Sequence, residues 1–342
     1  MKKKRVLVTG ASGTVGYEVL KQLVAQSMCF DVTVFDIETP KSRHALEPFR
    51  DRVRLVYGDV TQSNQLVTVC RGVDYVIHLA AVIPPLAYEN RQLAQRVNVE
   101  GTRNLISNLE SYSPNAFFAY GSSISVYGDR VQNPWIRVTD SLKPSDRDYY
   151  AVTKVAAEKI VRGSKLRWTI FRLAPIMGAQ NHKMGSLMFR MPLGTPIEII
   201  SPEDTARAFV NALQQVDLLE GKIFNLGGGA ENRIFFRDLL VNNFRLFGLG
   251  KFNLPAKAFA EKNFHCAYYA DGDELESILH FRRDNLASYW KRVEDSIPAW
   301  QYVLTRLVAP LVKKVWLFKS EPWQAYKTGN VKEIRHFFRG VS

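Results

Sequence analysis

A tyrosine and a lysine four residues apart, Tyr150 and Lys154 in the segment YAVTK, form the clearest chemical pair in the sequence. On a helix this spacing puts both side chains on one face. A free phenol has a pKa of about 10, so a neutral pKa requires about 4 kcal/mol in favour of the phenolate. An ammonium group about 4 Å away supplies an interaction of that size at an effective dielectric constant of about 20. The pair therefore predicts proton exchange between Tyr150 and a substrate hydroxyl, with Tyr149, on another part of the helix, as the weaker candidate.

A serine-rich segment, GSSISVYG at residues 121–128, follows a predicted strand over 116–120. Parallel sheets bind ligands at the carboxyl ends of their strands. A serine hydroxyl at this place can hydrogen-bond a reacting oxygen and orient it toward the tyrosine. Each of these serines taken alone would be an ordinary capping or packing residue. The combination with Tyr150, Lys154 and the glycine turn described next indicates hydride-transfer chemistry instead.

The segment TGASGTVG at residues 9–16 lies between the first predicted strand and the first predicted helix. Gly10 can take the tight turn, Gly13 lets the backbone approach a pyrophosphate, and Gly16 lets the helix pack closely on the sheet. The helix N-terminus then presents N–H groups to the phosphates. The segment therefore predicts a dinucleotide site.

An acidic residue, Asp36, ends the predicted strand over 31–36, 20 residues after Gly16. A carboxylate at this position hydrogen-bonds ribose hydroxyls and repels a 2′-phosphate. The sequence thus favours NAD as the cofactor. NADP stays an alternative, because the basic residues Lys41 and Arg43 lie close to Asp36 in the sequence.

The elements that must position these residues are short apolar runs alternating with helical patterns. Nearly continuous apolar runs are typical of a parallel sheet that is covered on both faces. The predicted strands are 5–9, 31–36, 53–57, 75–79, 116–120, 167–173 and 222–226, and the main predicted helices are 15–26, 91–109, 148–163 and 202–214. The predicted fold class is α/β, a doubly wound parallel (Rossmann) sheet with a smaller, mainly helical C-terminal substrate lobe.

This pattern also predicts the domain boundaries. Residues 1–173 form the dinucleotide-binding domain, and 202–229 return to it. Residues 174–201 and 230–342 form the substrate-binding lobe and a basic C-terminal tail.

The sequence resembles the extended short-chain dehydrogenases/reductases, the NAD-dependent epimerase/dehydratase family, over about residues 5–230. The matching segments are TGASGTVG (9–16), Asp36, GDV (58–60), HLAA (78–81), Asn98 in VNVEGT, SSISVYG (122–128), YAVTK (150–154) and RLAP (172–175). The resemblance implies that Ser123 is the catalytic serine, that Tyr150 is the general acid/base, and that Lys154 tunes Tyr150 and holds the nicotinamide ribose. It also implies a homodimer formed through the helices at 91–109 and 148–163.

The resemblance extends to the cofactor contacts. It implies that Asp59 and Val60 lie beside the adenine, that residues 79–81 follow the cofactor backbone, and that Pro175 and Ile176 lie near the nicotinamide. The expected cofactor-binding residues are Gly10, Ser12, Gly13, Thr14, Val15, Gly16, Asp36, Asp59, Val60, Leu79, Ala80, Ala81, Asn98, Ser122, Tyr150, Lys154, Pro175 and Ile176.

The sequence departs from two branches of this family. The sugar-nucleotide 4,6-dehydratases carry an acidic pair beside the catalytic Ser/Thr, where this chain has Ile124, Ser125 and Val126, so dehydration is rejected. The stretch at 178–201 is short and rich in methionine, which suits an apolar or small substrate or a packed core equally well. A sugar nucleotide stays an alternative substrate, because its anionic group could contact Arg190, His182 and Lys183.

The net charge of +13 is concentrated near the C-terminus, where residues 301–342 hold eight basic and two acidic side chains. We expect a solvated basic surface there rather than contact with a membrane surface, because Pro298, Pro310 and Pro322 interrupt any long amphipathic face. No nucleic-acid partner is expected. Three cysteines without CxxC spacing and six histidines without ligand spacing predict neither a disulfide framework nor a metal site, and we expect a reducing, cytoplasmic location.

These features together predict an NAD(P)-dependent oxidoreductase that interconverts a secondary alcohol and a ketone in a small or apolar substrate. A nucleotide-sugar 4-epimerase that uses the same Ser/Tyr/Lys set is one alternative. A non-catalytic NAD-binding sensor or interaction protein is an alternative from another class.

Overall fold

The computed structural model describes residues 3–178 and 185–340. Its centre is a sheet of seven parallel strands in the order β3-β2-β1-β4-β5-β7-β9. The strands are β1 (Lys4–Thr9), β2 (Phe30–Asp36), β3 (Arg54–Tyr57), β4 (Tyr75–His78), β5 (Phe117–Ser123), β7 (Arg167–Leu173) and β9 (Lys222–Leu226). Because all seven run the same way, their carboxyl ends share one edge of the sheet. The predicted doubly wound parallel sheet is confirmed.

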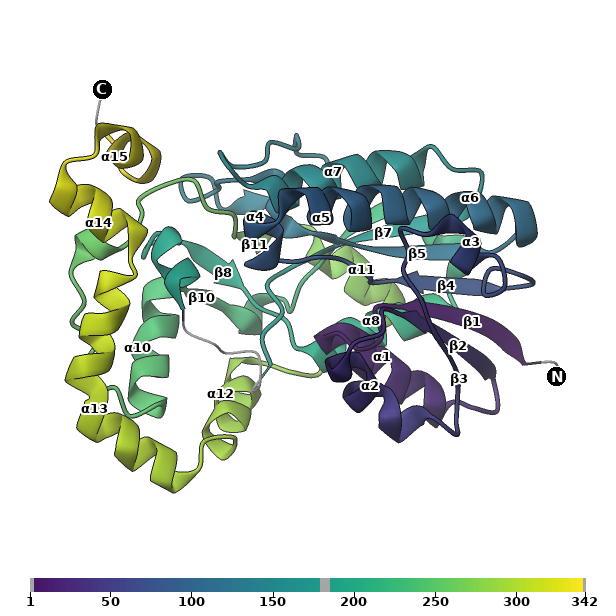
Figure 1. The fold of residues 1–342 in the computed structure, drawn as a ribbon, viewed down its shortest axis with the longest axis horizontal. Coiled ribbons are helices and arrows are strands. Elements are labelled where there is room, and N and C mark those ends of the chain that lie inside the picture. The colour runs from purple at the N-terminus through teal and green to yellow at the C-terminus, as the bar shows by residue number, and fades with distance from the viewer. Residues whose placement is uncertain (1–2, 179–184, 341–342) are drawn as a thin grey trace.

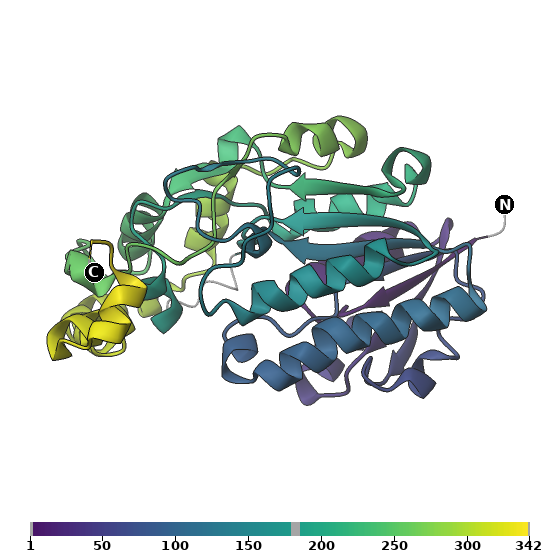
Figure 2. The same ribbon diagram turned by 90° about the horizontal axis from the view of Figure 1, so that it is seen from above.

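Helices cover both faces of the sheet (Figures 1 and 2). Alternate side chains of the strands are buried against the helices of opposite faces. Val6 and Val8 pack with α1 and α8, whereas Leu7 packs with α6 and α7 on the other face. This alternation is the two-residue period of a strand, and burial on both faces explains the uninterrupted apolar runs. The helices of the two faces are α1 (Thr14–Ala25) and α8 (Pro202–Ala212), against α3 (Ser63–Leu66), α5 (Arg91–Gln95), α6 (Thr102–Tyr112) and α7 (Tyr149–Arg162). Residues Arg96–Gly101 join α5 to α6 as a π-helical segment, so the predicted helix at 91–109 is one helical run.

The second body is a lobe at the carboxyl edge of the sheet (Figure 2). It contains a small core around Phe189, Phe236, Phe259 and Tyr289. Two short strand pairs were not predicted: β8 (Pro196–Glu198) pairs antiparallel with β10 (Arg233–Phe235), and β6 (Trp135–Ile136) pairs with β11 (Tyr268–Tyr269). The lobe helices are α10 (Phe236–Leu246), α12 (Leu286–Asp295), α13 (Ala299–Phe318), α14 (Glu321–Thr328) and α15 (Val331–Phe337). Helix α11 (Gly272–Leu279) instead packs beside α8 and β9 in the core of the sheet domain. The remaining short helices are α2 (Pro40–Leu46), α4 (Leu86–Glu89) and α9 (Val216–Leu219), with single turns at Glu47–Phe49, Ile124–Tyr127, Ser186–Arg190, Ala230–Asn232 and Ala256–Ala258.

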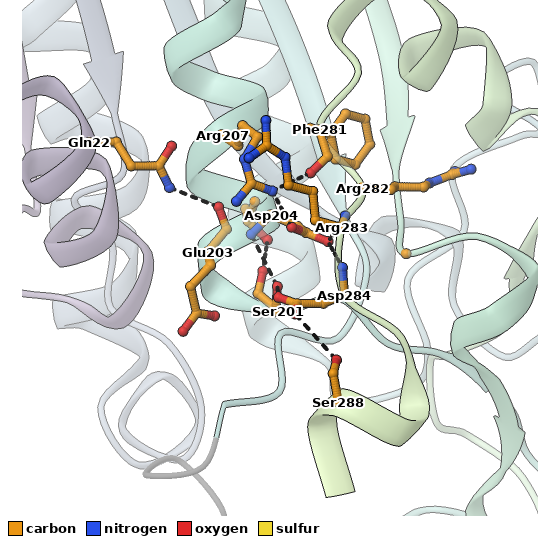
Figure 3. Close-up of polar contacts among 12 residues, drawn as sticks. Gln22, Ser201, Glu203, Asp204, Arg207, Phe281, Arg282, Arg283, Asp284 and Ser288 are labelled. Atoms are coloured by element: carbon orange, nitrogen blue, oxygen red, sulfur yellow. Dashed lines mark hydrogen bonds and ion pairs between the residues drawn. The ribbon is translucent and has the colours of Figure 1, made fainter. Parts of the chain in front are cut away.

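A buried aspartate, Asp204 in the first turn of α8, ties the lobe to the sheet domain (Figure 3). Its Oδ2 accepts hydrogen bonds from the backbone N–H groups of Arg283 and Asp284, both at 2.9 Å. The Ser201 hydroxyl, which caps α8, donates to Asp284 Oδ2 at 2.6 Å, and Ser288 in α12 donates to Asp284 Oδ1. One charged network thus links α8, which packs on the sheet, to the start of α12 in the lobe.

The expectation that prolines interrupt the C-terminal helices is wrong for Pro310, which lies inside the 20-residue helix α13. Pro310 has no N–H group, so the carbonyl of Arg306 loses its helical hydrogen bond. Both residues lie on the exposed side of α13, where water can bind this carbonyl instead. Pro298 and Pro322 stand at the N-cap of α13 and in the first turn of α14, where proline is compatible with a helix. Within residues 3–178 and 185–340, no helix combines the length and apolarity needed to cross a membrane.

Candidate active site

The glycine turn between β1 and α1 fits against the loop that follows β4. Gly10 has a φ of +74°, and a Cβ on it would lie 2.6 Å from the backbone nitrogen of Ala80. A Cβ on Gly16 would overlap the carbonyl oxygen of Gly10. Both positions therefore require glycine, in agreement with the roles that the sequence predicts for them.

The N-terminus of α1 is open at this turn. Gly13 is its N-cap, and within the described residues no side chain caps the helix and no acid occupies its first turn. Ser12 to Thr14 are partly or fully exposed, and the N–H groups of the first helical turn have no partner within the helix. These residues fit a cofactor pyrophosphate, which a helix N-terminus of this kind binds.

Asp36 ends β2 beside this turn and is buried. Its Oδ2 accepts a hydrogen bond from Ser12 N and its Oδ1 from Ile37 N, both at 2.8 Å. Burial raises the pKa of Asp36, and the bonds from Ser12 and Ile37 oppose this shift. The carboxylate therefore stands next to the pyrophosphate turn, where the sequence places a ribose ligand. Arg43, one of the two basic residues that left NADP as an alternative cofactor, forms an ion pair with Glu38.

Asn98 holds the loop after β4 in place. Its amide donates to Val82 O at 2.9 Å and to Thr153 Oγ1 at 2.9 Å, and its Oδ1 accepts from Val82 N at 2.7 Å. Asn98 thus joins residues 79–82 to α7 and acts here as a positioning residue. The other expected cofactor contacts lie just beyond the ends of β3, β4 and β7, namely Asp59, Val60, Leu79, Ala80, Ala81, Pro175 and Ile176.

Ser123, Tyr150 and Lys154 come together at the carboxyl end of β5. Ser123 is the last residue of β5, and its hydroxyl is close enough to the Tyr150 hydroxyl to lower the pKa of Tyr150. Lys154 Nζ lies 5.8 Å from the centre of the Tyr150 ring. Because α7 packs on β5, the helix delivers both of its residues to the end of the strand that carries Ser123.

The charges around Tyr150 differ from the simple pair that the sequence suggests. Burial raises the pKa of Tyr150, the neighbouring Ser123 hydroxyl lowers it, and the charge of Asp148 raises it further. Burial lowers the pKa of Lys154 to about 8, against the opposing influence of Glu158. Lys154 Nζ donates to Gly121 O at 2.7 Å and to the Tyr120 hydroxyl at 3.3 Å, rather than to the Tyr150 hydroxyl. Without cofactor, Tyr150 is therefore a protonated phenol at neutral pH.

A buried ion pair that we did not predict lies behind this site. Arg172 in β7 donates to Glu158 in α7 through Nε at 3.0 Å and Nη2 at 2.8 Å, and both residues are buried. The Ser122 hydroxyl donates to Glu158 Oε1 at 2.5 Å, so the hydroxyl of this expected cofactor-binding residue is hydrogen-bonded to the buried ion pair. The spacing of Glu158, four residues after Lys154, is the signal in the sequence that could have placed it on the same helix face.

A second unpredicted cluster borders Tyr150 on the lobe side. The Tyr88 hydroxyl donates to Asp148 Oδ1 at 3.3 Å, and His265 Nδ1 lies 2.8 Å from Asp148 Oδ2. Burial alone would raise the pKa of Asp148, but His265 and the hydrogen bonds hold it below its usual value. This cluster lines a cavity of about 210 Å³ between the start of α7 and the end of the lobe. The cavity is lined by Tyr88, Arg91, Asp146, Arg147, Asp148, Tyr149, Arg190, Lys262, Asn263, Phe264, His265, Glu321, His336 and Phe337.

The residues considered for substrate contacts are largely engaged. Arg190 donates to both carboxylate oxygens of Glu321, at 3.0 and 2.6 Å. His182, Lys183 and Met184 lie outside the described residues. The methionines in the described part of this stretch pack against the lobe core, namely Met177, Met188 and Met191. Among the described residues, no group of three or more His, Cys, Asp or Glu side chains could hold a metal ion.

Comparison with solved structures shows the fold. The dTDP-glucose 4,6-dehydratase of Streptomyces venezuelae, solved as a double mutant with NAD bound, superposes with a TM-score of 0.72 at 23% identity, covering 85% of this chain and 96% of that one. The UDP-glucuronic acid 4-epimerase of Bacillus cereus, solved with UDP-glucuronic acid and NAD, gives 0.71 at 20% identity, covering 85% and 98%.

Comparison by sequence shows the family. A 3-beta-hydroxysteroid dehydrogenase of Mycolicibacterium neoaurum is 27% identical over 248 residues, which are 68% of this chain and 64% of the relative. A decarboxylating sterol-4-alpha-carboxylate 3-dehydrogenase of Homo sapiens is 30% identical over 162 residues, 47% of this chain and 40% of the relative. The chain thus spans less than two thirds of the length of these relatives. The profile of the NAD dependent epimerase/dehydratase family matches residues 6–227, which confirms the resemblance stated above, and the chain belongs to this NAD-dependent family.

Proposed function

We propose that the protein is an NAD-dependent oxidoreductase that interconverts a secondary alcohol and a ketone. The observation that carries the proposal is the meeting of Ser123 and Tyr150, with Lys154 Nζ 5.8 Å from the centre of the phenol ring, at the sheet edge that bears the glycine turn and Asp36. We assign cofactor binding to residues 1–173 with 202–229, and substrate binding to residues 174–201 and 230–342. The intact set of three residues speaks against a sensor, which needs no proton donor.

The three residues divide the proton chemistry between them. The Ser123 hydroxyl holds the substrate oxygen by a hydrogen bond, next to the Tyr150 hydroxyl. In ketone reduction, the Tyr150 phenol donates its proton to the developing alkoxide, and the raised pKa of Tyr150 in the free protein suits this direction. In alcohol oxidation, Tyr150 must first become a phenolate, which the charge of Lys154 favours. When bound, oxidised NAD accepts the hydride and adds a positive charge.

We propose an apolar substrate with a ring-borne hydroxyl, of the sterol type. Two sequence relatives are named for sterol or steroid 3-dehydrogenation, which supports this class. The Arg190 guanidinium, the described candidate for a diphosphate contact, is bound by Glu321. The residues after Ser123 are Ile124, Ser125 and Val126, all buried, so the acidic pair of the dehydratases is absent from this described turn.

We further propose that the protein forms a homodimer through the exposed sides of α6 and α7. Val152 on α7 is 52% exposed, which leaves an apolar side chain for such a contact. Sedimentation of wild-type protein and of Val152→Glu tests the dimer; a monomeric wild-type protein would contradict it.

The function is tested by following NADH absorbance with 3β-hydroxysterols, their ketones and sugar nucleotides. A dehydrogenase forms or consumes NADH, whereas a 4-epimerase turns over with no net change. Tyr150→Phe should keep NAD affinity and lower turnover by about 10²-fold or more, because the proton donor is lost. Tyr149→Phe is the matched control, since it keeps the ring that lies 3.3 Å from the Arg91 guanidinium and should leave turnover within about twofold. A Tyr150→Phe rate close to wild type would rule out the assigned role.

A further inference from the structure

Helix α13 exposes an apolar face to solvent. The face consists of Trp300, Val303, Leu304, Leu307, Leu311, Val315 and Phe318, and we call it the α13 face. The exposed fraction is 68% for Trp300, 75% for Leu307, 64% for Leu311 and 76% for Phe318. These residues recur every three or four positions, so they form one stripe along a helix. Figure 1 shows α13 at the outer rim of the lobe, at the end of the molecule far from the N-terminus.

The opposite side of α13 anchors it to the lobe. Ala309 is buried, and it packs in a cluster with Phe244, Leu249 and the partly buried Trp316. Lys313 on this side donates to Lys251 O at 2.7 Å and to Asn253 Oδ1 at 2.9 Å. The inward side of α13 is thus packed against the lobe and hydrogen-bonded to it. The more apolar side of the helix is the one that faces water, which is the reverse of the ordinary arrangement in a water-soluble domain.

The charged side chains of α13 itself are all basic. Residues 296–320 contain four basic and no acidic side chains. Of the four, Arg306, Lys314 and Lys319 are exposed, and none of the three forms an ion pair with any other described residue. A second copy of this chain seated on the face would bring these cations together with no acid on the helix to neutralise them. An anionic surface would neutralise them directly.

We propose that the α13 face is a docking surface for anionic lipid bilayers. The helix lies along the bilayer surface with its apolar stripe among the acyl chains and Arg306, Lys314 and Lys319 at the headgroups. Helices that lie at a membrane interface share three features with α13: a large apolar face, lysine and arginine beside it, and a tryptophan, here Trp300, at one end. At about 1.5 Å per residue the helix is about 30 Å long, a length that lies flat on the surface without crossing it. The proposal holds whether or not the proposed reaction is correct.

Vesicle flotation of the full chain tests the proposal. Wild-type protein should float with vesicles of phosphatidylcholine and phosphatidylserine, bind phosphatidylcholine alone more weakly, and lose affinity as salt is raised. Leu307→Glu with Leu311→Glu should weaken binding about tenfold or more, because two charges replace inserted side chains. Both residues are exposed, so folding should persist, as unchanged NAD affinity and thermal midpoint would show. Leu218→Glu on α9 is the matched control, a leucine 50% exposed on another element, and it should float like wild type.

A second pair of substitutions separates charge from apolar insertion. Arg306→Gln with Lys314→Gln should remove most of the preference for anionic vesicles and leave binding to phosphatidylcholine unchanged. Wild-type protein that floats with neither vesicle would overturn the proposal, as would equal flotation of the Leu307→Glu/Leu311→Glu variant. An oligomer in lipid-free buffer that this variant abolishes would show that a second copy covers the face, and would also overturn it.

Discussion

Replacing Glu158 by glutamine tests the buried pair behind the catalytic residues. The exposed fractions of Glu158 and Arg172 are 2% and 3%, and the carboxylate accepts three hydrogen bonds, one from Ser122 and two from Arg172. Glutamine keeps the size of the side chain but removes its charge, which leaves the Arg172 cation buried without a counter-charge. Breaking a buried pair in this way costs about 3–5 kcal/mol of unfolding free energy. We therefore expect Glu158→Gln to lower stability by about that amount.

Urea unfolding followed by circular dichroism measures this loss. The control is Asp217→Asn, which breaks the exposed pair of Arg167 with Asp217, whose exposed fractions are 40% and 92%. An exposed pair contributes about 0–1 kcal/mol, so the control should stay close to wild type. Arg172→Met should cost less in the Glu158→Gln background than in wild type, because the two residues are coupled. A loss below about 1 kcal/mol in Glu158→Gln, or no coupling with Arg172, would refute the reasoning.

The same substitution has a kinetic consequence. The charge of Glu158 raises the pKa of Lys154, which burial lowers to about 8. Lys154 must be charged to favour the Tyr150 phenolate, and it loses this charge as the pH rises through its pKa. In Glu158→Gln the pKa of Lys154 falls further, so the alkaline limit of kcat/KM for alcohol oxidation should move to lower pH. An alkaline limit that stays in place would contradict the role of Lys154.

Three further substitutions probe the cofactor turn and the lobe side of the site. Asp36→Ala should reduce the preference for NAD over NADP, because it removes the carboxylate that repels a 2′-phosphate, and an unchanged ratio of kcat/KM for the two cofactors would disprove this role. Gly10→Ala should weaken NAD binding about tenfold or more in a fluorescence titration, because its Cβ would lie 2.6 Å from Ala80 N; an unchanged Kd would show that the turn is not part of the site. Asp148→Asn keeps a side-chain cap on α7 but removes the charge that raises the pKa of Tyr150, so the acidic limit of alcohol oxidation should move to lower pH. A limit that does not move would show that this charge does not act on Tyr150.

The sheet and the catalytic residues were predictable because their signals are local. The apolar runs of the seven strands reflect burial on both faces, and the YAVTK spacing lies within one helix. The pair of Asp148 and His265 was not predictable, because the two residues are 117 positions apart and meet only in the folded lobe. The strands β6, β8, β10 and β11 have two or three residues each, too few to show a period of two. Helix α13 was missed because the exposed side of a helix tolerates a proline that the inner side would not.

The network around Asp204 limits how substrates can enter. A hinge between lobe and sheet would have to part Asp204 from the backbone of Arg283 and Asp284, and would leave Oδ2 of this buried carboxylate without its two donors. We therefore expect the two bodies to unfold in one cooperative transition and to keep their relative orientation during turnover. Access to Tyr150 then depends on rotations of individual side chains and shifts of short loops between the lobe and the sheet, on a faster timescale than domain closure.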